Sequence, residues 1–189
     1  MSVQRHTLSP AVGVDPGIGF YLSGMDEVRE QLREAVAGMS DEQIARRAVS
    51  GAHSIGALVL HIGEAEWWWM QCVLSGHELT EEDRRQPYWD VLLEPDAFAR
   101  QGYNAQYCFD VIGDIRQETR RLLASFGEDS LERVYSHTRG DKTIEVSLRW
   151  VLHHLIDHEA QHKGQILMLK RLLGSESSGL GRNVGRQDE

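Results

Sequence analysis

Three histidines recur at every fourth position near the C-terminal end of the chain, within the stretch 150–166 (WVLHHLIDHEAQHKGQI). In an α-helix, residues four apart lie on neighbouring turns of one face, so His154, His158 and His162 would form a row. Apolar residues such as Leu155 share nearly the same stripe, and an apolar stripe faces a core. Imidazoles placed there need hydrogen-bond partners or a metal ion, because an unpaired buried polar group costs about 1–3 kcal/mol.

The pair His158 and His162 has two interpretations. A histidine on an apolar stripe is most often a core residue whose hydrogen bonds are satisfied. The i, i+4 spacing also lets two imidazoles point at one ion, so metal binding is an equally reasonable interpretation. A metal site would need at least one further ligand from elsewhere in the fold.

A third histidine, His61, lies in the middle of a second predicted helix, residues 54–75. Leu58, Ala65 and Trp68 share its helical face, so it also points toward the interior. Alone it would be interpreted as a core histidine. Together with the pair on the late helix, it predicts a three-histidine metal site between two helices of a bundle core.

Three neutral imidazoles leave a divalent cation with its full charge and an open coordination position, which is the catalytic pattern for zinc. Imidazole also suits Ni, Cu and Fe. Such an ion lowers the pKa of a bound water or thiol, or polarises a carbonyl. Glu64 and Gln165 each follow a triad histidine by three residues and are candidates to line the pocket. Glu64 is the one candidate for a catalytic base. The alternative interpretation is that Glu64 is an ordinary acidic residue on the surface.

Other residues near these helices have less defined positions. His154 is in phase but one turn early, and is a candidate for the pocket wall or for the groups that orient the ligands. His153 lies off the line of the pair.

The three consecutive residues Trp67, Trp68 and Trp69 cannot all face the core, because neighbouring helical positions are about 100° apart. At least one is expected at a groove, a pocket wall or a subunit interface.

Helical periodicity predicts four long helices, over residues 16–38, 54–75, 96–125 and 147–173, and a short helix over 41–47. Their start signals are capping side chains, namely Asp15 (followed by Pro16), Ser40 in a capping box with Gln43, Ser54, Asp96 and Ser147. Only residues 143–146 are predicted to be extended. The long connection 77–95 suits a crossover that lets the third long helix run parallel to the second. The sequence therefore predicts an all-α four-helix bundle with a crossover between long helices 2 and 3.

Composition places this bundle among soluble single domains. The 189 residues predict one domain over 1–174 and a disordered tail over 175–189. The net charge of −9 argues against nucleic acid as a partner. Without a signal-like N-terminus or an apolar stretch of membrane-spanning length, no membrane partner is expected. Cys72 and Cys108 are interpreted as buried thiols, which fits a cytoplasmic location.

The segment SIGALVLHIGEAEWWW, followed by SLRWVLHHLIDHEAQHKGQI, resembles the DinB-like metalloprotein superfamily, which includes mycothiol-dependent maleylpyruvate isomerases and bacillithiol transferases. The shared patterns are L-x-x-H-hydrophobic-x-x-x-E-x-x-W and H-x-x-x-H-(K/R)-G-Q. The resemblance places the metal triad on His61, His158 and His162, in agreement with helical phase. In the mycothiol-associated branch the position of His158 is often glutamate, whereas histidine is typical of the general superfamily. The resemblance implies bound Zn or Ni and a homodimer.

Three functions are compatible with these features. The first is a metal-dependent transferase or isomerase that uses a low-molecular-weight thiol, such as mycothiol or bacillithiol, on a small-molecule substrate. The second is a metal-dependent hydrolase with Glu64 as general base, and the third is a non-catalytic, stress-related metal-binding bundle. The open triad and the resemblance favour the first.

Overall fold

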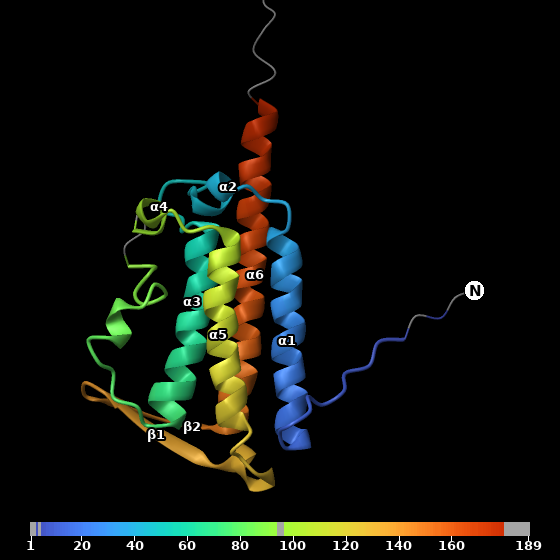
Figure 1. Cartoon of the computed structure of the whole chain (residues 1–189), viewed down its shortest axis with the longest axis vertical. Helices are drawn as coiled ribbons and strands as arrows, with labels where there is room; N and C mark the ends of the chain where they lie inside the picture. The colour runs from blue at the N-terminus through green and yellow to red at the C-terminus, as the bar shows by residue number, and fades with distance from the viewer. Residues whose placement is uncertain (1–2, 4, 94–96, 180–189) are drawn as a thin grey trace, which may run out of the picture.

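Four long helices run side by side in the computed structural model, which describes residues 3, 5–93 and 97–179 (Figure 1). They are α1 (Pro16–Val36), α3 (Ile55–Trp67), α5 (Ala105–Leu123) and α6 (Leu148–Gly179). Shorter helical segments connect them, namely α2 (Asp41–Ala45), α4 (Ala97–Gln101) and two 3₁₀ turns at Asp83–Arg85 and Glu128–Glu132.

The helices pair in parallel, α1 with α6 and α3 with α5, and the two pairs run in opposite directions (Figure 1). Contacts along α1 and α6 agree with this direction. Gly24 lies beside Ile156, and further along both helices the Lys170 ammonium donates to the carbonyl of Ala35. The segment between α3 and α5 returns along the outside of the bundle. The predicted four-helix bundle with a crossover is confirmed.

Most predicted helix starts are present as hydrogen bonds from backbone N–H groups to capping side chains, at Asp15, Ser40, Ser54 and Ser147. The capping box at Ser40 is complete, because the Gln43 side chain accepts from the Ser40 amide in return. These bonds satisfy amide groups that have no partner inside the helix. The remaining predicted cap, Asp96, lies outside the described residues.

The third long helix is shorter than predicted. The sequence predicted one helix over 96–125, but α4 ends at Gln101 and α5 begins at Ala105. Gly102 has φ +67°, a left-handed conformation that ends a helix, and the Asn104 side chain then accepts from the Tyr107 amide. The predicted helix is therefore two helices, because the first ends at Gly102 and the second begins with its own N-cap at Asn104.

A β-hairpin precedes α6, formed by β1 (Val134–Arg139) and β2 (Lys142–Ser147) in antiparallel register. The extended conformation predicted for residues 143–146 is confirmed, but the rest of the hairpin was missed. Most of its residues are exposed, so the strands lack the alternating apolar pattern that identifies a half-buried strand. Gly140, with φ +63°, begins the two-residue turn, a position where glycine is favoured.

Two long helices differ from the prediction in other ways. The helix predicted over 54–75 continues from α3 as a π-helix over Trp68–Leu74, a form that often occurs at functional sites. The helix predicted to end at residue 173 runs to Gly179. Residues 175–179, predicted as part of a disordered tail, therefore continue α6, and residues 180–189 lie outside the described part of the chain.

A layer of buried charge separates two apolar clusters in the bundle. Each long helix contributes one charged side chain that is no more than 6% exposed: Arg29 from α1, Glu66 from α3, Arg116 from α5 and Glu159 from α6. The Arg29 guanidinium lies 2.5 Å from Oε1 of Glu159 and 3.0 Å from Oε2 of Glu66. Nε of Arg116 lies 2.7 Å from Oε1 of Glu66. The layer therefore connects all four long helices.

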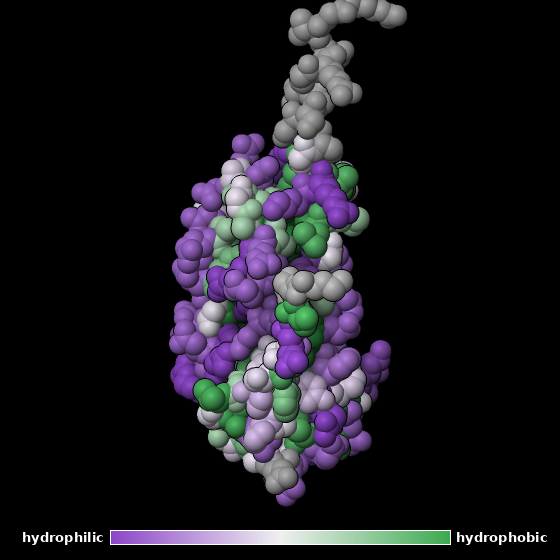
Figure 2. Space-filling view, turned by 90° about the vertical axis from the view of Figure 1, so that its right-hand side faces the viewer, coloured by the Kyte–Doolittle hydropathy of each residue, from purple (hydrophilic) through white to green (hydrophobic). Residues whose placement is uncertain are grey.

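The outer face of the bundle is largely polar. Figure 2, which views the side that carries α1, shows mostly hydrophilic groups, with apolar groups in small separate patches. On α1 the exposed positions include Glu27, Glu30 and Glu34. No helix within the described ranges is long and apolar enough to cross a membrane.

Candidate metal centre

The structure brings the three predicted ligand residues together, His61 from α3 and His158 and His162 from α6. One ring nitrogen from each lies within 4.8 Å of the others. The ring centroids of His61 are 5.2 Å from His158 and 5.1 Å from His162, and the Nε2 atoms of His158 and His162 are 3.1 Å apart. Antiparallel packing of α3 on α6 produces this arrangement, because the middle of one helix faces two successive turns of the other.

Two of the imidazoles are held from outside by hydrogen bonds. The Nδ1 atom of His61 lies 2.9 Å from Oε2 of Glu64, and the Nδ1 atom of His162 lies 2.9 Å from Oε1 of Gln165. Because these oxygens accept hydrogen bonds, each Nδ1 carries the proton and each Nε2 presents a lone pair. Acceptors of this kind orient metal-binding histidines. Glu64 and Gln165 were both predicted to line this pocket.

Glu64 has a second contact that bears on its role. Its other oxygen, Oε1, accepts a hydrogen bond of 3.0 Å from the backbone amide of Asp90 in the crossover. With one oxygen on His61 and the other on Asp90, the carboxylate is fixed in place. This geometry favours an orienting role for Glu64 over the role of a mobile general base.

Burial favours the neutral form of the two triad histidines of α6. Burial, together with the neighbouring His162 and His61, lowers the pKa of His158 to about 3. Burial also lowers the pKa of His162, although the Gln165 hydrogen bond acts in the opposite direction. Neutral imidazoles are the form that binds metals.

The donor set fits a divalent metal ion. Three neutral nitrogen donors converge, and two are already oriented by acceptors on their outer side. Imidazole donors suit Zn, Ni, Cu and Fe. Zn–N bonds of about 2.0–2.1 Å require only small side-chain rotations from nitrogen separations of this size.

An aromatic wall adjoins the triad on the side of the β-hairpin. The His154 ring stacks on Trp150 at a centroid distance of 4.8 Å and contacts Trp69 at 5.3 Å. It lies 5.8 Å from His158, one turn along α6. His154 therefore lies beside the triad, and its role as pocket wall or orienting group stays a prediction.

The three consecutive tryptophans divide as expected from helical geometry. Trp67 is 8% exposed and packs on the crossover at Trp89, whereas Trp68 and Trp69 are half-buried. Trp68 contacts His137 of β1 at 5.1 Å. Trp67 lines two surface cavities, which confirms the prediction that at least one would lie at a groove or pocket wall.

The sequence interpretation missed the buried charges behind the triad. Arg29 and Arg116 were not identified, and Glu159 was left without a role. The glutamate of the motif shared with the DinB-like superfamily is Glu66, which accepts hydrogen bonds from both arginines. These four charged residues lie at helical positions that face the interior, and this phase could have indicated their burial. Charged residues are ordinarily exposed, however, so the phase alone did not predict it.

The sequence profile of the mycothiol-S-transferase family matches residues 22–173, most of the chain. This chain belongs to the mycothiol-S-transferase family. The matched span includes His61, His158 and His162, together with Glu64 and Gln165. Membership in the mycothiol-S-transferase family confirms the resemblance to DinB-like proteins.

Two solved structures share the fold of this mycothiol-S-transferase family member. A conserved protein from Enterococcus faecalis has a TM-score of 0.60 and 16% identity, over 82% of this chain and 95% of its own. The second is YfiT from Bacillus subtilis, described as a probable metal-dependent hydrolase with an unusual four-helix bundle topology. It has a TM-score of 0.57 and 16% identity, over 92% of this chain and 94% of its own. A search of curated proteins gave no match.

Proposed function

We propose that His61, His158 and His162 bind one divalent metal ion, and that the protein transfers a low-molecular-weight thiol to an electrophilic small molecule. The observation that carries this proposal is the convergence of three imidazoles, two of them oriented from outside by Glu64 and Gln165. The family favours mycothiol as the thiol. The substrate is a small electrophile.

His61, His158 and His162 would hold the ion through three imidazole nitrogens, which is the number of protein ligands typical of catalytic zinc sites. A divalent ion at this position supplies Lewis acidity, which lowers the pKa of a thiol that binds it and favours the thiolate. Glu64 and Gln165 hold the rings of His61 and His162 in fixed orientations. The aromatic wall formed by Trp69, Trp150 and His154 lies beside the triad on the hairpin side.

The reaction is a nucleophilic transfer. The thiol loses its proton, its sulfur forms a bond to the electrophilic atom of the acceptor, and a leaving group departs with its electron pair. With an unsaturated acceptor the sulfur adds and a proton returns to the neighbouring carbon. Elimination of the thiol from that adduct, after rotation about the intervening bond, would give an isomerase.

A metal-dependent hydrolase is the second candidate, favoured by the description of the fold neighbour YfiT. Hydrolysis by this site would require a base beside the attacking water. Glu64 is the nearest candidate in the sequence, but both of its oxygens are engaged. The thiol transferase therefore ranks first.

The test is a transfer assay with the zinc- or nickel-loaded protein. Mycothiol, bacillithiol and glutathione are each mixed with a fluorogenic thiol-reactive electrophile, and adduct formation is followed beside a His158→Ala/His162→Ala variant. We expect a rate above the uncatalysed reaction with mycothiol and its loss in the variant. Rates equal to the uncatalysed reaction with every thiol, together with metal-dependent ester hydrolysis, would favour the hydrolase instead.

A further inference from the structure

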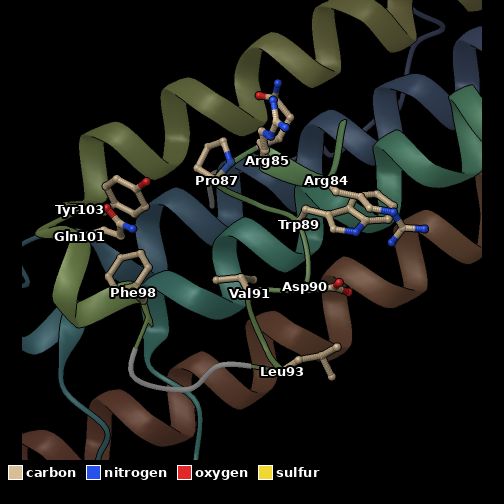
Figure 3. A pocket seen from close by; sticks show the side chains of 11 residues that line it. Arg84, Arg85, Pro87, Trp89, Asp90, Val91, Leu93, Phe98, Gln101 and Tyr103 are labelled. Atoms are coloured by element: carbon tan, nitrogen blue, oxygen red, sulfur yellow. The ribbon is translucent and has the colours of Figure 1, made fainter. Parts of the chain in front are cut away.

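A surface cavity lies along the crossover that connects α3 to α5. It has a volume of about 400 Å³ and is formed mainly by residues 84–93, with Phe98 and Tyr103 at one end and Arg84 beside Trp89 at the other (Figure 3). Sites for small molecules commonly have volumes of about 300–1,000 Å³. We call this cavity the crossover pocket.

The crossover pocket has an apolar floor and a rim of hydrogen-bond donors. Val91 and Phe98 are buried in the floor. Arg84 and Arg85 stand at the rim, and in the part of the chain that the structure describes their guanidinium groups form no ion pair. The two guanidinium groups therefore offer hydrogen-bond donors and positive charge to a bound molecule.

Arg84 lies beside the Trp89 ring at this rim. Its guanidinium carbon lies 6.0 Å from the centroid of the Trp89 ring, at the limit of a cation–π contact. A guanidinium packed on an aromatic ring loses less freedom when it binds an anion. Among the described residues that line the pocket, Asp90 is the one carboxylate, beside the two guanidinium groups.

The crossover pocket and the metal centre share a wall. Asp90 lines the pocket, and its amide donates to Glu64, whose other oxygen contacts His61. Asp90 has φ +52°, a conformation that non-glycine residues rarely adopt and that is often retained at functional sites. Two hydrogen bonds therefore separate the pocket lining from a triad histidine.

We infer that the crossover pocket binds a small organic anion, with its carboxylate or phosphate on Arg84 and Arg85 and its apolar part on Phe98. This inference goes beyond the proposed function, because no residue of the histidine triad lines the crossover pocket. Guanidinium groups bind carboxylate and phosphate oxygens through paired, charge-assisted hydrogen bonds. Arg84 and Arg85 are then the residues that bind the anion.

The experiment is calorimetric titration of the metal-loaded protein with cinnamate, an unsaturated aromatic carboxylate, and with its neutral amide. Arg84→Gln/Arg85→Gln removes both charges from exposed positions. Arg5→Gln/Arg133→Gln removes two charges from exposed positions outside the pocket lining. We expect cinnamate to bind the wild type and this control equally, and the pocket variant at least about tenfold more weakly.

A further variant separates the inference from the proposed function. The His158→Ala/His162→Ala protein cannot hold a carboxylate on a metal ion, so retained cinnamate binding would support the crossover pocket even if the metal proposal failed. Displacement of cinnamate by inorganic phosphate would show that the pocket also binds phosphate groups, and absence of displacement would assign it to carboxylates. Equal affinity of the wild type and Arg84→Gln/Arg85→Gln, equal affinity for the amide, or no cinnamate binding would overturn the inference.

Discussion

At the scale of single residues, Glu64 joins the metal centre to the crossover. It is only three positions from His61 in sequence, yet its second contact is the amide of Asp90. A carboxylate behind a metal-binding histidine fixes the ring and raises the basicity of the donor nitrogen. The effect of Glu64 should therefore appear in metal affinity before it appears in folding.

Replacing Glu64 by alanine should weaken metal binding by about 10- to 100-fold, the range found when such outer hydrogen bonds are removed. Competition with a chromophoric chelator measures this affinity. Glu81→Ala, at an exposed position of the same charge, is the control. Equal zinc affinity in the Glu64→Ala variant and the wild type would show that the carboxylate does not orient His61.

At the scale of helices, α3 packs closely against α5 at Gly63 and against α4 at Gly56. A Cβ atom added to Gly63 would lie 2.6 Å from Cγ2 of Ile112, and one added to Gly56 would lie 2.0 Å from Cζ of Phe98. Either contact is too short to persist without movement of the neighbouring chain. These two glycines keep the helix that carries His61 packed in position.

Gly63→Ala should lower the free energy of unfolding. Overpacking costs about 1–3 kcal/mol, and the better helix propensity of alanine recovers about 0.5–1 kcal/mol of this. Gly113→Ala is a matched control on α5, because nothing lies within 4 Å of its added Cβ, and it should be neutral or stabilising. Urea denaturation at pH 7 compares them. A Gly63→Ala protein as stable as Gly113→Ala would contradict the close approach.

The elements that sequence predicted best are those with strong local signals. Ser40, Ser54 and Ser147 cap the helices as predicted, and helical phase selected the triad. The break before α5 was missed because the apolar period continues across Gly102, and only its left-handed conformation reveals the stop. The crossover pocket could not be predicted, because its lining is irregular backbone whose path depends on tertiary contacts.

At the scale of the whole molecule, the buried ionic layer holds the four long helices in register. Burial alone would raise the pKa of Glu66, but the charges of Arg116 and Arg29 more than offset this and lower it to about 2. Removing one partner from a buried ion pair costs about 3–5 kcal/mol, because the remaining charge is uncompensated. The charged side chains give no apolar pattern, so sequence periodicity could not reveal that they form one layer.

Glu66→Gln should therefore destabilise the protein by several kcal/mol at pH 7. The folded pKa of Glu66 lies below its ordinary value of 4.5, so its contribution is present above about pH 4.5 and is lost as the pH falls toward 2. The wild type should lose stability over this window more steeply than the variant. Denaturation across pH 3–7 tests this, with the exposed Glu132→Gln as control. Parallel pH profiles for the wild type and Glu66→Gln would contradict the account.

The metal content of the purified protein, measured by mass spectrometry beside the His158→Ala/His162→Ala variant, tests the central claim most directly. The account predicts about one divalent ion per chain, absent from a variant that still folds. No metal in either protein, with a melting temperature unchanged by added zinc or nickel, would contradict it. The three histidines would then be ordinary residues of the bundle interior.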